Sequence, residues 1–148
     1  MAAWERTRQI AGALDARVVV FQCPASFKAT RQNRDNLARF FSKIERDNYV
    51  LAWEPRGEWE AEDIRRLCLS LHLVHCVDPF QASPGTQGLA YYRLHGRGSF
   101  RYRYTQQDFK VLRDRALDWP EAYVLFNNVD MYRDAASFGA MLMGNTGA

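Results

Sequence analysis

Short apolar runs rich in β-branched and aromatic residues recur five times along the chain. Each has the length of one strand, and the first, RVVVFQC, is apolar on both faces, which is typical of a strand covered on both sides. The pattern predicts strands over residues 17–23, 49–55, 71–78, 89–96 and 122–128. The segment PFQASPGTQG, residues 79–88, is expected to be a loop because it is rich in Pro, Gly and Ser.

Between these runs, apolar residues recur at the spacing of an amphipathic helix. The clearest case runs from Leu37 to Ile44, with apolar residues at i, i+3, i+4 and i+7, and Asn33 or Asn36 is the expected N-cap. Helices are predicted over residues 1–14, from 33 or 36 to 44, from about 61, over 106–117, and over 133–143 with Ala135, Phe138 and Leu142 buried. Strands that alternate with helices of this length indicate parallel β-α-β units. The sequence therefore predicts an α/β fold with five parallel strands and flanking helices.

Composition narrows the class of protein. The chain has 148 residues, 47% of them apolar, which suits one compact domain and excludes a disordered chain. No apolar run reaches the roughly 18 residues of a membrane span, and the N-terminus MAAWERTRQI lacks the features of a secretory signal. The odd number of cysteines, Cys23, Cys68 and Cys76, indicates reduced thiols. We therefore expect a cytoplasmic protein with no membrane partner.

Polar or ionisable residues stand at the end of every predicted strand. Alternation along YYRLHG places Arg93 and His95 on one face and Tyr92 and Leu94 on the opposite, helix-covered face. In parallel α/β folds the carboxyl ends of the strands form the edge at which ligand sites are built. The residues expected at this edge are Gln22, Glu54, Arg56, Asp78, Arg93, His95, Asn127 and Asn128. A structural interpretation is that Glu54–Arg56 and Asp78–Arg93 are ion pairs.

These residue types favour chemistry on an anionic or phosphate-bearing substrate. His95 is the candidate general acid–base, because imidazole side chains as a class titrate near neutral pH. Glu54 or Asp78 would orient His95 or hold a metal, and Arg56 and Arg93 would bind the anion. Gln22, Asn127 and Asn128 complete the predicted substrate-binding set. The reaction and any cofactor stay open, and so does whether the chain is an enzyme.

Two other site types find weaker support in the sequence. His72, His75 and Cys76 lie close together in sequence as zinc ligands would, but neighbouring strand residues point to opposite faces, and no second ligand pair follows. No metal is therefore predicted. The chain also lacks a glycine-rich phosphate loop and a nucleophile-elbow motif.

The net charge of +3 is too small to indicate a nucleic-acid partner by itself. The exception is RLHGRGSFRYRY, residues 93–104, where Arg97, Arg101 and Arg103 are interleaved with aromatic residues, a composition that grips phosphates and stacks on bases. A nucleic-acid-binding module that uses this stretch is thus one alternative to an enzyme. A loop that packs its rings on the protein and solvates its arginines would have the same pattern.

Five motifs in order along the chain resemble the YecE-like family, domain of unknown function 72. They are FQCPASF (21–27), AWEPRGEW (52–59), VDPF (77–80), YYRLHGRG (91–98) and VLFNN (124–128). The form EPRGEW is most similar to archaeal-type members. The resemblance implies a TIM-barrel-like fold of some 250 residues, and it implies no particular reaction. The family's polar positions correspond largely to the strand-end residues named above.

Members of this family begin with three further strands that carry a Gly-Trp motif and an Asn-Ser-Thr-Phe-Tyr-type motif, and neither motif is present here. The resemblance therefore predicts a single incomplete domain over residues 1–148, holding strands four to eight of an eight-stranded barrel. Five strands cannot close, and open edges favour self-association or a partner chain. A misassigned gene start, a split protein and a stand-alone open half-barrel all fit this pattern. An accessory half-barrel that completes another chain is the remaining functional alternative.

Overall fold

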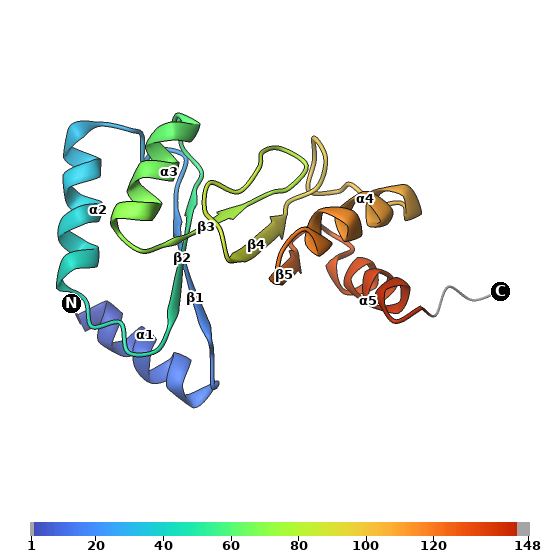
Figure 1. The fold of residues 1–148 in the computed structure, drawn as a ribbon, viewed down its shortest axis with the longest axis horizontal. Helices are drawn as coiled ribbons and strands as arrows, with labels where there is room; N and C mark the ends of the chain where they lie inside the picture. The colour runs from blue at the N-terminus through green and yellow to red at the C-terminus, as the bar shows by residue number, and fades with distance from the viewer. Residues whose placement is uncertain (1, 145–148) are drawn as a thin grey trace. The chain divides into compact units, whose positions relative to one another are not determined.

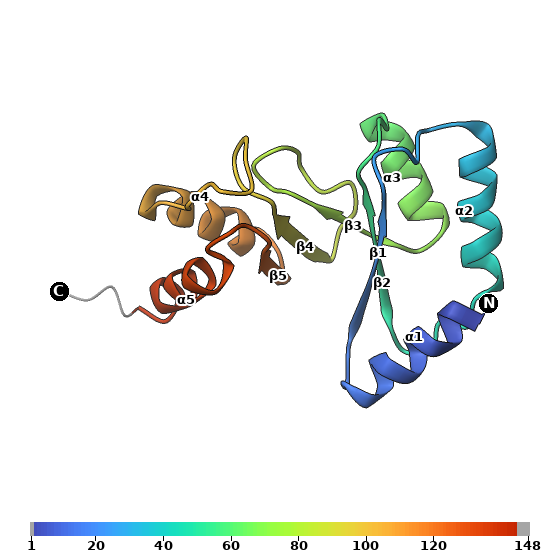
Figure 2. The same ribbon diagram turned by 180° about the vertical axis from the view of Figure 1, so that it is seen from behind.

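The computed structural model describes residues 2–144 and has an α/β fold with a five-strand parallel sheet and five helices, as the sequence predicts. The chain divides into two compact units, Met1–Cys76 and Val77–Ala148. Figures 1 and 2 show the strand and helix order of each unit from opposite sides. Among residues 2–144, no helix combines the length and the apolar character needed to cross a membrane.

The first unit alternates helix and strand from its N-terminus. Its elements are α1 (Ala2–Ala13), β1 (Val18–Cys23), α2 (Arg31–Lys43), β2 (Val50–Pro55), α3 (Ala61–Ser70) and β3 (Val74–Val77). β1 and β2 run parallel in a register that pairs Val18 with Val50, and β3 pairs with β2 through Trp53 and His75. All three helices contribute to one core, where Trp4, Phe41 and Leu67 pack with residues of β2. That core explains why α2 and α3 lie on one side of β1 and β2 in Figure 1.

The second unit holds β4 (Leu89–Leu94), α4 (Gln106–Leu117), β5 (Glu121–Phe126) and α5 (Met131–Leu142). β4 and β5 are parallel and in register from Leu89–Glu121 to Leu94–Phe126. The helices cover the strand face that carries Tyr92 and Leu94, and these side chains pack with Phe109 and Phe138. The predicted alternation along β4 is confirmed, because Arg93 lies on the face opposite this core.

Two details of the helices differ from the prediction. The N-cap of α2 is Thr30, whose side chain accepts a hydrogen bond from the backbone N–H of Asn33 at 3.2 Å, so the predicted caps Asn33 and Asn36 were wrong. The predicted burial of Phe138 in α5 is confirmed, but the predicted burial of Ala135 and Leu142 is wrong. Both are exposed, and Asp134 is buried instead. The helix is rotated because the Asp134 carboxylate bonds inward to Asn128 and Tyr104.

Candidate functional site

Arg93 and Asn127 meet at the carboxyl ends of β4 and β5. The backbone N–H of Asn127 donates to the carbonyl of Leu94 at 2.8 Å, which continues the strand pairing beyond β5. With its amide oriented so that the oxygen faces the guanidinium, Asn127 accepts from Arg93 Nη2 at 2.5 Å and from Nε at 3.1 Å. An amide from one strand thereby fixes the orientation of a guanidinium on its neighbour.

His95 is the first residue beyond β4, and its backbone is held from two sides. Its N–H donates to Asp78 Oδ2 at 3.1 Å. The next residue, Gly96, has a φ of +88° and donates its N–H to the hydroxyl of Tyr104 at 2.9 Å. A Cβ on Gly96 would lie 2.1 Å from the carbonyl oxygen of Ser99, so this tight turn requires glycine. The turn fixes where the half-buried His95 leaves the strand.

Asp78 is buried and bonds to backbone groups as well as to a side chain. Besides the N–H of His95, it accepts from the N–H of Phe80 at 2.9 Å and from Gln81 Nε2 at 3.5 Å. These contacts order the turn after β3 and anchor the turn after β4. They support a positioning role for Asp78.

Asp108 organises the arginine-rich segment. Its carboxylate accepts from Arg97 Nη1 at 2.7 Å, from the Tyr102 hydroxyl at 2.8 Å, and from both the N–H and the hydroxyl of Thr105. Burial alone would raise the pKa of Asp108, but these hydrogen bonds outweigh it and lower the pKa below its ordinary value. Arg97 therefore faces a carboxylate that stays ionised.

The two loops at this edge are joined by three contacts. Asn128 Nδ2 donates to the carbonyl of Tyr102 at 2.8 Å, the N–H of Val129 donates to the carbonyl of Phe100 at 2.7 Å, and Arg103 pairs with Asp130. Asn128 is 2% exposed, so its hydrogen bond between the two loops is shielded from water. Arg101 differs from Arg97 and Arg103: it lies over the exposed Phe100 ring, 5.7 Å from the centroid.

The first unit holds the other predicted residues at the ends of β1 and β2. Gln22 and Glu54 are partners in the strand register. Glu54 is 5% exposed; its Oε2 lies 4.0 Å from Cys76 Sγ, and its Oε1 lies 4.0 Å from Nε of the exposed Arg56. The predicted residues thus form one group in each unit. Within residues 2–144, no set of three His, Cys, Asp or Glu side chains is placed to hold a metal ion.

The chain as a whole can be compared with known protein families. The family model described as "Protein of unknown function DUF72" matches residues 2–147. The chain belongs to the DUF72 family. No curated protein matches this DUF72 chain.

Solved DUF72 structures share the fold. A DUF72 family protein from Thermotoga maritima superposes with a TM-score of 0.75 at 24% identity, covering 94% of this chain and 64% of that one. A DUF72 family protein from Enterococcus faecalis gives a TM-score of 0.72 at 19% identity, covering 92% of this chain and 66% of that one. The chain thus spans just under two thirds of these relatives. At these identities the likeness establishes the fold alone.

Three residues of this DUF72 site were missed by sequence reasoning: Tyr104, Asp108 and Asp134. Asp108 had a signal, since Thr105 followed three positions later by an acid is the pattern of a capping box, and both of its hydrogen bonds form. No sequence pattern pointed to Asp134, because an acidic residue in the first turn of a helix is ordinarily exposed to solvent. Tyr104 was noted only as one of the aromatic residues of the segment 93–104, which either stack on bases or pack on the protein, although its hydroxyl accepts from the N–H of Gly96.

Proposed function

We propose that the carboxyl ends of β4 and β5 form a binding site for an anionic, phosphate-bearing group, with Arg93 as the anion ligand. The observation that supports this proposal is the contact between Asn127 and Arg93. A guanidinium presents parallel N–H donors that match the oxygens of a phosphate or carboxylate. The Asn127 amide orients these donors and so reduces the side-chain entropy lost on binding.

His95 is the proposed acid–base of the same site. It follows Arg93 by two positions, and the bonds of Asp78 and Tyr104 hold the backbone on both sides of its Cα. An imidazole in that position would donate a proton to a leaving group or accept one from a nucleophile. In the first unit, Arg56 is proposed as a second anion-binding side chain. It lies beside Glu54, whose partner in the neighbouring strand is Gln22.

A nucleic-acid module is the less supported function. Arg97 and Arg103 are both paired with carboxylates, and Tyr102 and Tyr104 pack against the core. Pairing lowers the positive potential that phosphate contacts need. The arginine-rich segment therefore fits a structural role better than a phosphate-binding one.

We also propose that the five strands correspond to strands four to eight of an eight-stranded barrel, within one incomplete domain. The superposition on 64% of the Thermotoga protein supports this correspondence. The free thiols of Cys23, Cys68 and Cys76 support a cytoplasmic location, because the reducing cytosol keeps thiols from pairing.

The test uses inorganic phosphate as the probe and the complete chain. Thermal unfolding is measured in phosphate and in chloride at matched ionic strength, since a ligand that binds the folded state raises the melting temperature. Phosphate should raise that temperature in the parent protein, and Arg93→Ala should abolish the rise. Arg93→Lys keeps the charge but loses the fork, so it should retain only part of the rise.

The matched control is Arg113→Ala, which removes an arginine that pairs on the surface with Asp114 and should leave the phosphate effect unchanged. A phosphate effect that survives in Arg93→Ala, or that is absent from the parent protein, would contradict the proposed site.

A further inference from the structure

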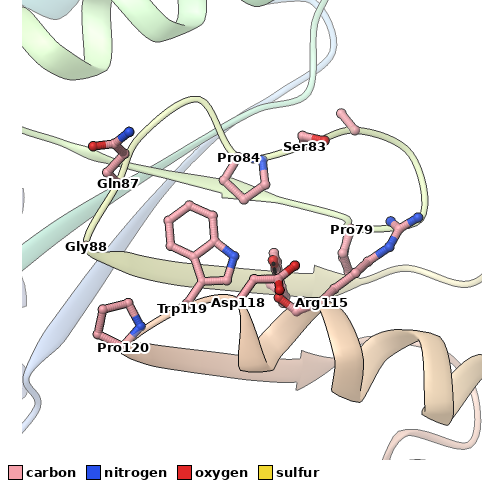
Figure 3. A pocket seen from close by; sticks show the side chains of 11 residues that line it. Pro79, Ser83, Pro84, Gln87, Gly88, Arg115, Asp118, Trp119 and Pro120 are labelled. Carbon is pink, nitrogen blue, oxygen red and sulfur yellow. Dashed lines mark hydrogen bonds between the residues drawn. The ribbon is translucent and has the colours of Figure 1, made fainter.

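A cavity of about 600 Å³ lies in the second unit, away from the proposed anion site. It is open to solvent and is bordered by the loop over residues 79–88 and by the turn between α4 and β5 (Figure 3). Tyr92 lines it, and since Tyr92 and Arg93 point to opposite faces of β4, the cavity lies on the helix-covered face. The cavity exists because the connection from β3 to β4 contains no helix, so only a loop covers this part of the strand.

Trp119 supplies an aromatic wall whose orientation is fixed. The ring is half-buried and packs against the core of the second unit. The Tyr92 hydroxyl, whose pKa is raised by burial, donates to the carbonyl of Arg115 at 3.4 Å on the same wall of the cavity. Figure 3 shows the broad face of the Trp119 ring between Pro84 and Pro120. Together with these two prolines, the Trp119 ring gives the cavity a flat, apolar wall.

The cavity is lined by one positively and one negatively charged side chain, which do not pair with each other. Arg115 and Asp118 lie three positions apart at the end of α4, both exposed, and neither forms an ion pair within the described chain. The Arg115 guanidinium lies over the Phe80 ring, 5.7 Å from its centroid. Ser83 and Gln87 add side chains that make no hydrogen bond within residues 2–144.

This lining discriminates between classes of ligand. An anion would meet Asp118, and a cation would meet Arg115, so each simple ion is repelled by one of the two charges. A hydroxyl group both donates and accepts hydrogen bonds and can therefore use an arginine and a carboxylate side by side. A ring with several hydroxyls and an apolar face would satisfy these groups while packing on an indole.

We propose that this cavity binds the ring of a neutral sugar. The ring packs on Trp119, and its hydroxyls donate to Asp118 and accept from Arg115 and Gln87. The volume falls within the range of about 300–1,000 Å³ typical of small-molecule sites. No residue of this cavity belongs to the proposed anion site, so each proposal can be refuted without affecting the other.

Saturation-transfer NMR on the complete chain tests the proposal, with the methyl glycosides of glucose, galactose and mannose as probes. At least one should receive saturation through its ring protons from the parent protein. Asp118→Asn and Arg115→Gln alter exposed side chains and should weaken that glycoside's binding about tenfold, the loss expected for one hydrogen bond to a charged group. Trp119→Phe should weaken binding about threefold to tenfold through the smaller ring.

Asp114→Asn is the matched control, because Asp114 is also an exposed acid of α4 and does not line the cavity. Its glycoside binding should equal that of the parent. The absence of saturation transfer to all three glycosides would overturn the proposal. So would binding that Asp118→Asn and Arg115→Gln leave unchanged. L-Leucine, a zwitterion, is the probe for a ligand that carries both charges. If it binds and no glycoside does, Arg115 and Asp118 recognise a zwitterion, and the proposal is overturned as well. Trp119→Phe is interpreted only if it melts cooperatively; the two exposed variants decide the question in either case.

Discussion

Replacing Asp108 by asparagine tests whether one carboxylate holds the arginine-rich segment in place. The side chain of Asp108 is 5% exposed and accepts four hydrogen bonds. Asparagine has nearly the same shape but only one acceptor oxygen, and its amide nitrogen is a donor. Because three bonds reach Oδ2 and one reaches Oδ1, the amide oxygen is expected to take the Oδ2 position. The amide nitrogen then faces the Arg97 guanidinium.

The size of the effect follows from these bonds. A hydrogen bond to a charged group contributes about 1.5–3 kcal/mol against about 1 kcal/mol for a neutral one. Three bonds are weakened and one is lost, but the lost partner, Arg97, is 53% exposed, so solvent reduces its share to about 1 kcal/mol or less. We expect Asp108→Asn to lower the free energy of unfolding by about 2–4 kcal/mol. For a chain of this size that corresponds to roughly 4–16 °C in melting temperature.

The measurement is thermal and urea unfolding followed by circular dichroism, with Asp114→Asn as the control. Asp114 pairs with its neighbour Arg113 on the surface, so its substitution should cost less than about 0.5 kcal/mol. The lowered pKa of Asp108 adds a second readout. Its stabilisation is present above the ordinary carboxyl range and is lost as the pH falls through the lowered pKa, so the gap between parent and variant should shrink in acid. A loss below about 1 kcal/mol, or a gap independent of pH, would refute the reasoning.

Three further substitutions test other parts of the fold by the same unfolding measurements. Burial lowers the pKa of His75 to about 4, whereas it titrates near 6.5 when unfolded. Stability should therefore fall by about 3 kcal/mol as the pH drops from 6.5 to 4, and His75→Gln should remove most of this dependence. Gly96→Ala should cost more than about 2 kcal/mol, because the new Cβ meets the Ser99 carbonyl, whereas Gly98→Ala, with a φ of +78° and open space, should cost about 1 kcal/mol. Equal losses in the two glycine variants would contradict the steric argument. Thr30→Ala should cost about 1 kcal/mol through the lost α2 cap, and an unchanged stability would mean that the cap does not form in solution.

Much of the fold could be predicted because hydrophobic periodicity dominates it. The strand over Leu89–Leu94 and the helix over Gln106–Leu117 occur where the period-two and period-3.6 patterns place them. The helix α5 and the burial of its Phe138 were predicted, but the rest of its buried face was not, because periodicity counts apolar residues only. Asp134 turns inward to accept from Asn128 and from the N–H of Tyr104, and the contact with Tyr104, 30 positions away, is one that the local sequence does not encode.

The candidate site was predictable in position but less so in roles. Alternation places Arg93 and His95 on one face, and strand ends bring Asn127 beside Arg93. Alternation does not reveal which polar groups bond to backbone. The hydrogen bond from the His95 N–H to Asp78 and the bond from the Asn128 amide to the Tyr102 carbonyl both depend on how the loops fold, while the predicted catalytic role of Asp78 and the predicted substrate-binding role of Asn128 stay predictions. Such roles depend on loop geometry that a strand pattern does not contain.

The connection from β3 to β4 contains no helix, and this affects which sequence changes the protein can accept during evolution. An exposed part of this loop, residues 81–83, accepts insertions, deletions and polar substitutions that a packed helix would resist, whereas Pro79 and Phe80 pack on the core. Mutation in residues 81–83 can therefore reshape the wall of the cavity while the neighbouring strands keep their pairing. Within one small scaffold, one surface is free to change its specificity while the opposite face of the same strand stays fixed by its hydrogen bonds.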